Sequence, residues 1–246
     1  MPPQSGPLRE VFLVYGAVAL ATGVVCRLPG AWVQQNLVPA LLAVLFIAVA
    51  VRQAKHDPRG VSHYGIELGG VFGEPVHDKG FFEELWILAK HNLPKVIQTL
   101  GAALLIAAVV FPLFTLGFIE WFKPQQAFVF PKTSEMFSFG LSQLILIALP
   151  EEMFFRGYIQ TRLTDAWPAT RHVCGAELSI PAWLLQALLF ALLHAVSMPQ
   201  PHRLAVFFPG LLFGWARAYH RGIGVSIWLH AMSNVYSHLL AQGFYS

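Results

Sequence analysis

The stretch LILIALPEEMFFRGYIQ, from Leu144 to Gln160, places two adjacent acids in an otherwise apolar run. Glu151 and Glu152 follow Pro150, and Arg156 comes four residues after the second acid. Apolar and aromatic residues continue beyond the acids, which favours a membrane helix over a solvated end of a span. A charged side chain inside a bilayer costs about 2.5–3.5 kcal/mol on insertion scales, so such residues persist mainly where they pair or have a function.

The composition of the whole chain supports a membrane location. Of the 246 residues, 56% are hydrophobic and 12% are charged, and the mean hydropathy is +0.56. A soluble domain carries about 25% charged residues. The net charge of +3 forms no dense basic patch, so a nucleic-acid partner is not expected. Cys26 and Cys174 are far apart and indicate neither a disulfide framework nor a zinc site.

The expected fold is an all-α bundle of about seven transmembrane helices, because a span needs about 20 mostly apolar residues. The first run is taken as a retained span, with a cleaved signal peptide as the minor alternative. The candidate spans are residues 10–28, 32–51, 96–119, 137–160, 180–197, 204–218 and 223–242.

A cytoplasmic N-terminus places 12 of the 16 Lys and Arg residues on the cytoplasmic side. The sequence therefore predicts a multi-pass protein of the cell membrane with its C-terminus outside. Residues 52–95 are expected to form a polar cytoplasmic loop. Within it, residues 81–90 resemble an amphipathic lead-in to the third span. We divide the chain into residues 1–95, with the first spans and this loop, and residues 96–246, the proposed catalytic core.

The two acids have different expected environments. Glu152 and Arg156 are spaced i, i+4, and Glu on the N-terminal side is the favourable order for an ion pair on a helix. Glu151 is rotated by about 100° and has no cation on its own helix. A carboxylate in apolar surroundings is a candidate proton acceptor.

Two later segments carry further polar residues. His194 ends FALLH in the fifth segment, and His230 and Asn234 are spaced i, i+4 in the seventh. Each also fits a structural role, because His and Asn form hydrogen bonds between membrane helices. At 1.5 Å rise per residue, all three elements can bring these groups to a similar depth. A carboxylate, two imidazoles and a carboxamide together are suited to activating water and binding an oxyanion.

Three motifs in order then resemble a known family. EEMFFR fits EExxxR, FALLH fits FxxxH and HAMSN fits HxxxN. This order is similar to that of the CPBP superfamily, which includes CAAX prenyl proteases of the Rce1 type and Abi-like, bacteriocin-processing membrane proteins. The resemblance covers about residues 137–242.

The resemblance implies a glutamate-dependent intramembrane endopeptidase. Glu151 would act as general base, His194 would position or polarise the water, and His230 and Asn234 would bind the oxyanion. Glu152 and Arg156 would support them as a structural pair. No metal and no other cofactor is implied, although His and Glu are also zinc ligands.

The implied partners are a peptide or protein substrate and the lipid bilayer. Prenylated substrates are not carried over from the family name, and the sequence does not define the oligomeric state. One alternative is a non-catalytic immunity or scaffold protein with the same polar cluster. Another is a small transporter with a proton site at Glu151, but the hydropathy shows no inverted repeat.

Overall fold

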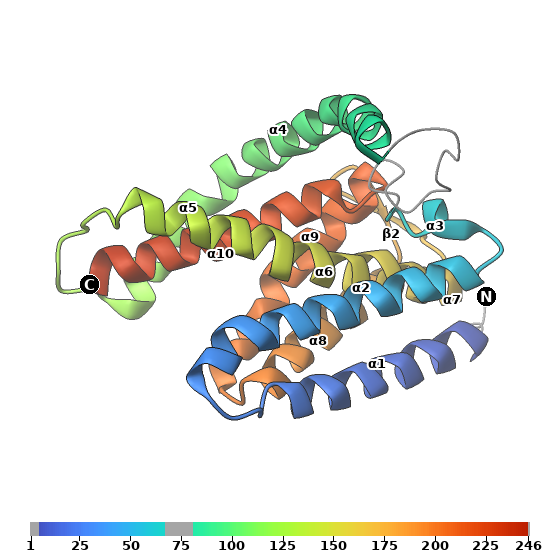
Figure 1. Ribbon diagram of the computed structural model, residues 1–246, viewed down its shortest axis with the longest axis horizontal. Helices are drawn as coiled ribbons and strands as arrows, with labels where there is room; N and C mark the ends of the chain where they lie inside the picture. Colours follow the sequence, from blue (N-terminus) through green and yellow to red (C-terminus); the bar gives the residue numbers. More distant parts are fainter. Residues whose placement is uncertain (1–4, 67–80, 246) are drawn as a thin grey trace.

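Each segment that the sequence predicts as a span contains a helix in the computed structural model, which describes residues 5–66 and 81–245 (Figure 1). The long helices are α1 (Ser5–Val25), α2 (Val38–His56), α4 (Phe81–Phe122), α8 (Ile180–Ser197), α9 (Phe207–His220) and α10 (Gly224–Tyr245). Short helical turns are η1 (Val33–Leu37), α3 (Gly60–His63) and η5 (Pro201–Val206).

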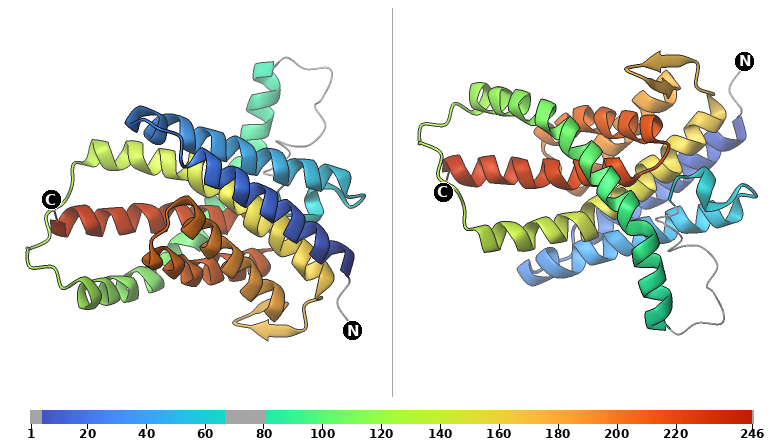
Figure 2. Two further views of the ribbon diagram at one scale, coloured as in Figure 1. Left: turned by 90° about the horizontal axis from the view of Figure 1, so that it is seen from below. Right: turned by 90° about the horizontal axis from the view of Figure 1, so that it is seen from above.

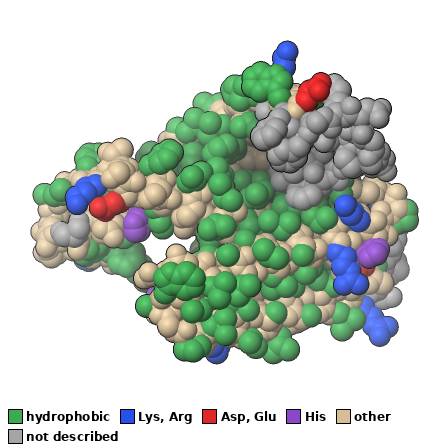
Figure 3. Space-filling view, in the orientation of Figure 1, with side chains coloured by type: hydrophobic (Ala, Val, Ile, Leu, Met, Phe, Trp, Pro, Cys, Tyr) green, Lys and Arg blue, Asp and Glu red, His purple; other side chains and the backbone are tan. Residues whose placement is uncertain are grey.

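Within residues 5–66 and 81–245, five helices are long and apolar enough to cross a membrane, and the protein is therefore a helical membrane bundle. These are Gly6–Val25, Val33–His56, Lys90–Phe122, Thr133–Ala166 and Ile180–Ser197. The sixth and seventh expected segments form α9 and α10. Helix α9 has only 14 residues, and α10, with 22 residues, is less apolar than the five. Hydrophobic side chains cover much of the visible face, and the charged side chains lie toward its ends (Figure 3).

The third span begins much earlier than residue 96. Helix α4 is continuous over 42 residues, which is roughly 63 Å at the usual rise. The hydrocarbon core of a bilayer is about 30 Å thick, so α4 extends well beyond it. Figure 2 shows α4 running obliquely across the other helices. The first turns of α4 are formed by residues 81–90, which we expected to be an amphipathic lead-in to the third span, and residues 67–80 lie outside the described part.

The acidic pair lies in a long helix that contains two π-helical segments. The segments are α5 (Thr133–Ser142), η3 (Gln143–Ala148), α6 (Leu149–Glu152), η4 (Met153–Ile159) and α7 (Gln160–Ala166). The segments η3 and η4 are π-helical, and wider turns of this kind occur frequently at functional sites. Pro150 lies between them and lacks an N–H, which interrupts the regular hydrogen-bond ladder.

All seven residues of η4 are buried, so this segment is the centre of the bundle. Phe154 stacks on Phe46 of α2 with ring centroids 5.5 Å apart, and Phe155 meets Phe190 of α8 edge to face at 5.0 Å. The Tyr15 hydroxyl of α1 donates to the Leu189 carbonyl at 2.9 Å. Helices α1, α2 and α8 thereby fix the orientation of the helix that carries the acids.

A charged cluster joins the end of the bundle where the N-terminus lies (Figure 1). Asp165 accepts two hydrogen bonds from Arg59, at 2.9 and 2.7 Å, and one from Arg162 at 3.1 Å. Arg162 also pairs with Glu10. Hydrogen bonds from Arg59 hold the pKa of Asp57 below its usual range, against the opposing effect of burial. The cluster ties α1 and the α2–α3 turn to α7.

A short antiparallel hairpin at the same end was not expected from the sequence. Strand β1 (Arg171–Val173) pairs with β2 (Ala176–Leu178), and the register places Arg171 opposite Leu178. The turn needs a left-handed backbone at Cys174 and at Gly175, with φ of 46° and 80°. At three residues each, these strands are too short to give a period-two pattern that separates them from a loop.

Candidate active site

Three helices bring the predicted polar residues to one region. Glu151 and Glu152 come from α6, His194 from α8, and His230 and Asn234 from α10. Helices α6 and α10 pack through η3, and α8 packs beside η4. The expected convergence in depth is therefore present, although 43 to 83 residues separate Glu151 from its neighbours in the chain.

Glu152 is fully buried and bonded on two sides. Its Oε1 accepts from the Arg156 guanidinium at 2.9 Å and from His230 Nδ1 at 2.8 Å. The carboxylate therefore links the ion pair expected on its own helix to an imidazole of α10. Since Arg156 supplies the compensating positive charge, Glu152 acts as a hydrogen-bond acceptor that orients His230.

Arg156 is also fully buried, and its other contacts come from α8 and α9. One guanidinium nitrogen donates to the Gly210 carbonyl at 3.3 Å. The guanidinium carbon lies 4.2 Å from the Phe190 ring centroid and 5.2 Å from that of Phe213. Arginine stacks favourably on aromatic faces, so this cage holds the cation without exposing it to lipid.

Glu151 has a different environment from Glu152. Its Oε2 lies 3.9 Å from His194 Nε2 and 3.7 Å from His230 Nε2. Both distances are too long for a direct hydrogen bond, and this buried oxygen has no hydrogen-bond partner in the described part of the chain. A single water molecule bridges polar groups at such separations. The geometry thus leaves one carboxylate oxygen and two imidazole nitrogens facing a common point.

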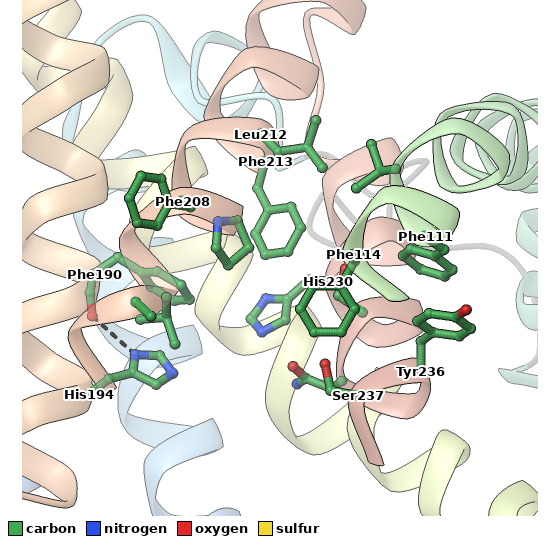
Figure 4. A pocket seen from close by; sticks show the side chains of 16 residues that line it. Phe111, Phe114, Phe190, His194, Phe208, Leu212, Phe213, His230, Tyr236 and Ser237 are labelled. Carbon is green, nitrogen blue, oxygen red and sulfur yellow. Dashed lines mark hydrogen bonds between the residues drawn. The ribbon is translucent and has the colours of Figure 1, made fainter. Parts of the chain in front are cut away.

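The partners of the two histidines fix which ring nitrogen carries the proton. His194 Nδ1 lies 3.0 Å from the Phe190 carbonyl, which can only accept, so Nδ1 carries hydrogen and neutral Nε2 is an acceptor (Figure 4). His230 Nδ1 likewise donates to Glu152. His230 also stacks on Phe213 of α9, with ring centroids 5.0 Å apart. Both Nε2 atoms are consequently the ones left to act on a ligand.

Asn234 has a partner that the sequence analysis missed. Its side-chain amide donates to Gln143 Oε1 at 2.8 Å. Gln143 lies in η3, in the same long helix as the acids. An isolated glutamine in an apolar run was the available signal, but spacing along one helix could not indicate a partner on α10. One amide hydrogen of Asn234 is still free for a ligand, since the group has two.

A cavity of about 520 Å³ opens beside the two histidines. Its walls come from α4, α8, α9 and α10 and are mostly aromatic and aliphatic. In Figure 4, His194 and His230 point toward the same space from facing helices, with Phe114 and Phe213 beside His230. The described residues that reach the cavity include Phe111, Phe114, Phe190, His194, Phe208, Phe213, His230 and Asn234. A largely apolar pocket with a few convergent polar groups is the usual form of a ligand site.

Two glutamines join the site to α9 through glycines. Gln186 donates to the Gly210 carbonyl at 3.1 Å, and Gln160 donates to the Gly214 carbonyl at 2.9 Å. A Cβ at Gly214 would lie 2.4 Å from Gln186 Nε2. The absence of a side chain at this position therefore lets both amides reach the backbone of α9. Spacing along one helix could not indicate these partners on α9.

The described residues contain no group of three or more His, Cys, Asp or Glu arranged to hold a metal ion. Metal-independent chemistry remains a prediction, and a chelator tests it directly.

The comparisons with known proteins agree with the order of the motifs. The model of the family described as type II CAAX prenyl endopeptidase Rce1-like matches residues 133–236. No curated protein and no solved structure gives a significant match. The matched segment contains all six predicted site residues. Residues 133–236, the segment that carries the three motifs, are thus similar to the Rce1-like, CPBP-type family of membrane proteins.

Proposed function

We propose that the protein is an intramembrane endopeptidase of the glutamic type, acting on a peptide or protein at the membrane. The observation that carries the proposal is the unpartnered Glu151 oxygen, which faces the Nε2 atoms of His194 and His230 at 3.9 and 3.7 Å. The match to a family described as an endopeptidase supports the same reaction class.

In the proposed reaction Glu151 removes a proton from water as the oxygen attacks the carbonyl carbon of the scissile peptide. The neutral Nε2 of His194 accepts the second hydrogen of that water and orients it. The carbonyl oxygen becomes an oxyanion, which accepts a hydrogen bond from the free amide hydrogen of Asn234. His230 Nε2 donates a second hydrogen bond once the ring has taken up a second proton. Glu151 then returns its proton to the amide nitrogen as the C–N bond breaks, leaving a carboxylic acid and an amine.

Glu152 and Arg156 do not touch the substrate in this scheme. The hydrogen bond from His230 Nδ1 to Glu152 directs Nε2 at the reacting carbonyl. Arg156 balances the charge of Glu152, and the Glu152 carboxylate accepts from His230 Nδ1. The pair thus orients a catalytic group and supplies charge balance.

The lining of the cavity favours an apolar or extended peptide segment as the part of the substrate that binds beside Glu151. Aromatic side chains of α4 and α9 line it together with His194, His230 and Asn234. The scissile bond would therefore lie beside these polar groups, with apolar flanking residues in the rest of the cavity. By the charge distribution, we place the protein in the cell membrane with its N-terminus in the cytoplasm.

The competing function is a non-catalytic immunity or scaffold protein. The bonds around Glu152 would also serve that role, because they hold α6, α9 and α10 together. Glu151 distinguishes the two functions, since an unpartnered carboxylate oxygen contributes nothing to a scaffold.

The test compares wild type with Glu151→Gln at equal expression in the same membranes. New protein N-termini are catalogued by mass spectrometry, and the peptides spanning them are then incubated with purified protein in proteoliposomes. We expect at least one terminus that requires Glu151 in cells and is regenerated in vitro. If every terminus persists in Glu151→Gln, the protease proposal fails and the scaffold remains.

The matched control is Glu135→Gln, which changes an exposed acid of α5 in the same long helix. It should cleave like wild type. Thermal unfolding of both variants shows that lost cleavage does not reflect a lost fold.

A further inference from the structure

A second cavity, of about 240 Å³, lies at the end of the bundle that carries the hairpin. It shares no lining residue with the cavity beside Glu151. We call it the Arg217 pocket, and it is defined by residues of α3, α7, β2 and α9. The ones used below are Gln160, Thr161, Asp165, Ser179, Arg217 and Arg221.

Arg217 is an arginine that has no counter-ion among residues 5–66 and 81–245. It makes no hydrogen bond and no ion pair with any described residue, and its Nε is fully buried. The backbone of Gly65 lies directly against the guanidinium, since a Cβ there would lie 2.9 Å from a terminal nitrogen. Gly65 has φ of +64°, so the close approach depends on glycine. The residue is partly buried, and its terminal nitrogens are not among the buried atoms that lack a partner, so they can donate to a ligand. A partly buried guanidinium that has no acid partner among the described residues favours an anion in the pocket.

The two acids that line the pocket, Asp165 and Glu177, make no ion pair with Arg217. Asp165 already accepts hydrogen bonds from Arg59 and Arg162 and lies 3.1 Å from His63 Nε2. Its charge is thus compensated by two guanidinium groups. Glu177, the other acid that lines the pocket, is exposed on the short strand β2.

The uncharged polar groups that line the Arg217 pocket indicate which kind of anion it binds. The Ser179 hydroxyl is buried and unpartnered among the described residues, and Thr161 adds a second hydroxyl. Gln160 Oε1 is also buried without a donor. The pocket therefore offers a guanidinium and hydroxyl donors together with one acceptor. A carboxylate or a sulfate has no O–H for that acceptor, whereas a singly protonated phosphate group has acceptors and an O–H.

We propose that the Arg217 pocket binds a phosphate group, with the Arg217 guanidinium and the Ser179 hydroxyl donating to its oxygens. The phosphate O–H donates to Gln160 Oε1, and Arg221 at the exposed rim attracts the anion. Arginine is well suited to phosphate because its planar donors match the oxygens. The second pKa of a phosphomonoester is near 6, so the protonated form is accessible close to neutrality.

Free phosphate and a lipid phosphomonoester headgroup are two sources of the same chemistry. In the orientation that we predict from the Lys and Arg distribution, the end of the bundle with the Arg217 pocket faces the cytoplasm, where free phosphate and lipid headgroups are both present. Because the pocket is separate from the Glu151 site, the inference does not depend on the proposed protease activity.

Binding is measured on the full chain, purified in neutral detergent without phosphate, by thermal unfolding against added inorganic phosphate at constant ionic strength. We expect a saturable rise in the unfolding temperature, and a smaller rise with sulfate at equal low concentration. Arg217→Gln should weaken phosphate binding roughly 10–100-fold, the factor expected for one charge-assisted hydrogen bond. The matched control, Arg52→Gln, changes an exposed arginine at the end of α2 and should bind as wild type does.

A wild-type protein with no saturable shift, or an equal shift in Arg217→Gln, overturns the proposal. If Arg217→Gln does not fold, Ser179→Ala replaces it, and unchanged phosphate affinity in that variant overturns the assignment as well. Nanodiscs then identify the source. If a phosphatidic-acid headgroup fills the pocket, the effect of free phosphate disappears in discs that contain this lipid but persists in phosphatidylcholine discs. If it persists in both, free phosphate is the ligand.

Discussion

Removing the Arg156 guanidinium while keeping an apolar side chain of similar length should destabilise the bundle severely. In Arg156→Met, the Glu152 carboxylate keeps only its hydrogen bond from His230 and loses its counter-ion. Both side chains of the pair are completely buried. Breaking a buried pair on one side costs about 3–5 kcal/mol, because the remaining charge stays in a low-dielectric site.

The double variant Glu152→Gln/Arg156→Met separates this charge effect from lost packing. A neutral amide can still accept from His230, and methionine still packs on the Phe190 and Phe213 rings. We therefore expect the double variant to be more stable than Arg156→Met by about 1–3 kcal/mol, a typical coupling energy for residues in direct contact.

The free energy of unfolding is measured by titration of SDS into mixed micelles, with the fluorescence of the tryptophans as the signal. Arg52→Met is the control, since an exposed arginine should change stability by less than about 0.5 kcal/mol. If Arg156→Met loses less than about 1 kcal/mol, or the double variant is no more stable than it, the ion pair does not hold the site together.

Three further predictions concern packing, pH and metal. Gly214→Ala should lower the free energy of unfolding by about 1–3 kcal/mol through overpacking, because its Cβ would lie 2.4 Å from Gln186 Nε2. The control Gly117→Ala meets nothing within 4 Å and should be neutral or stabilising in the same unfolding titration. Because Arg59 lowers the folded-state pKa of Asp57, the carboxylate stabilises the fold above its unfolded pKa of about 3.9, and this contribution falls away as pH drops through the folded value. Asp57→Asn should therefore unfold at a lower temperature than wild type at pH 6, with the gap narrowing below about pH 4; a constant gap contradicts the argument. Cleavage of the identified peptide should be unchanged after dialysis against a strong chelator, and loss of cleavage that zinc restores would instead indicate a metal enzyme.

Local spacing was sufficient to predict one half of the site. The i, i+4 order of Glu152 and Arg156 predicts their ion pair, and the structure confirms it at 2.9 Å. It could not predict that the same carboxylate also binds His230, because that contact joins residues 78 apart. The roles proposed for the site residues remain predictions, since geometry alone does not show a reaction.

The contacts that escaped prediction share a physical cause. The Asn234–Gln143 bond, the Gly210 and Gly214 contacts and the Arg59–Asp165 pairing all join distant segments. Each uses an ordinary residue type whose partner is set by how the helices pack. The start of α4 agrees with the expected lead-in over residues 81–90, but the charged residues there lower the local hydropathy, so hydropathy alone begins the third span at residue 96.

The two adjacent acids are best understood through the division of charge between them. Arg156 is the one buried cation described at the site, and its bond goes to Glu152. This pairing leaves Glu151 beside two imidazoles and without a guanidinium, so its proton can move without breaking an ion pair. In the proposed mechanism Glu152 therefore provides the fixed charge, and Glu151 is the carboxylate that accepts and returns a proton.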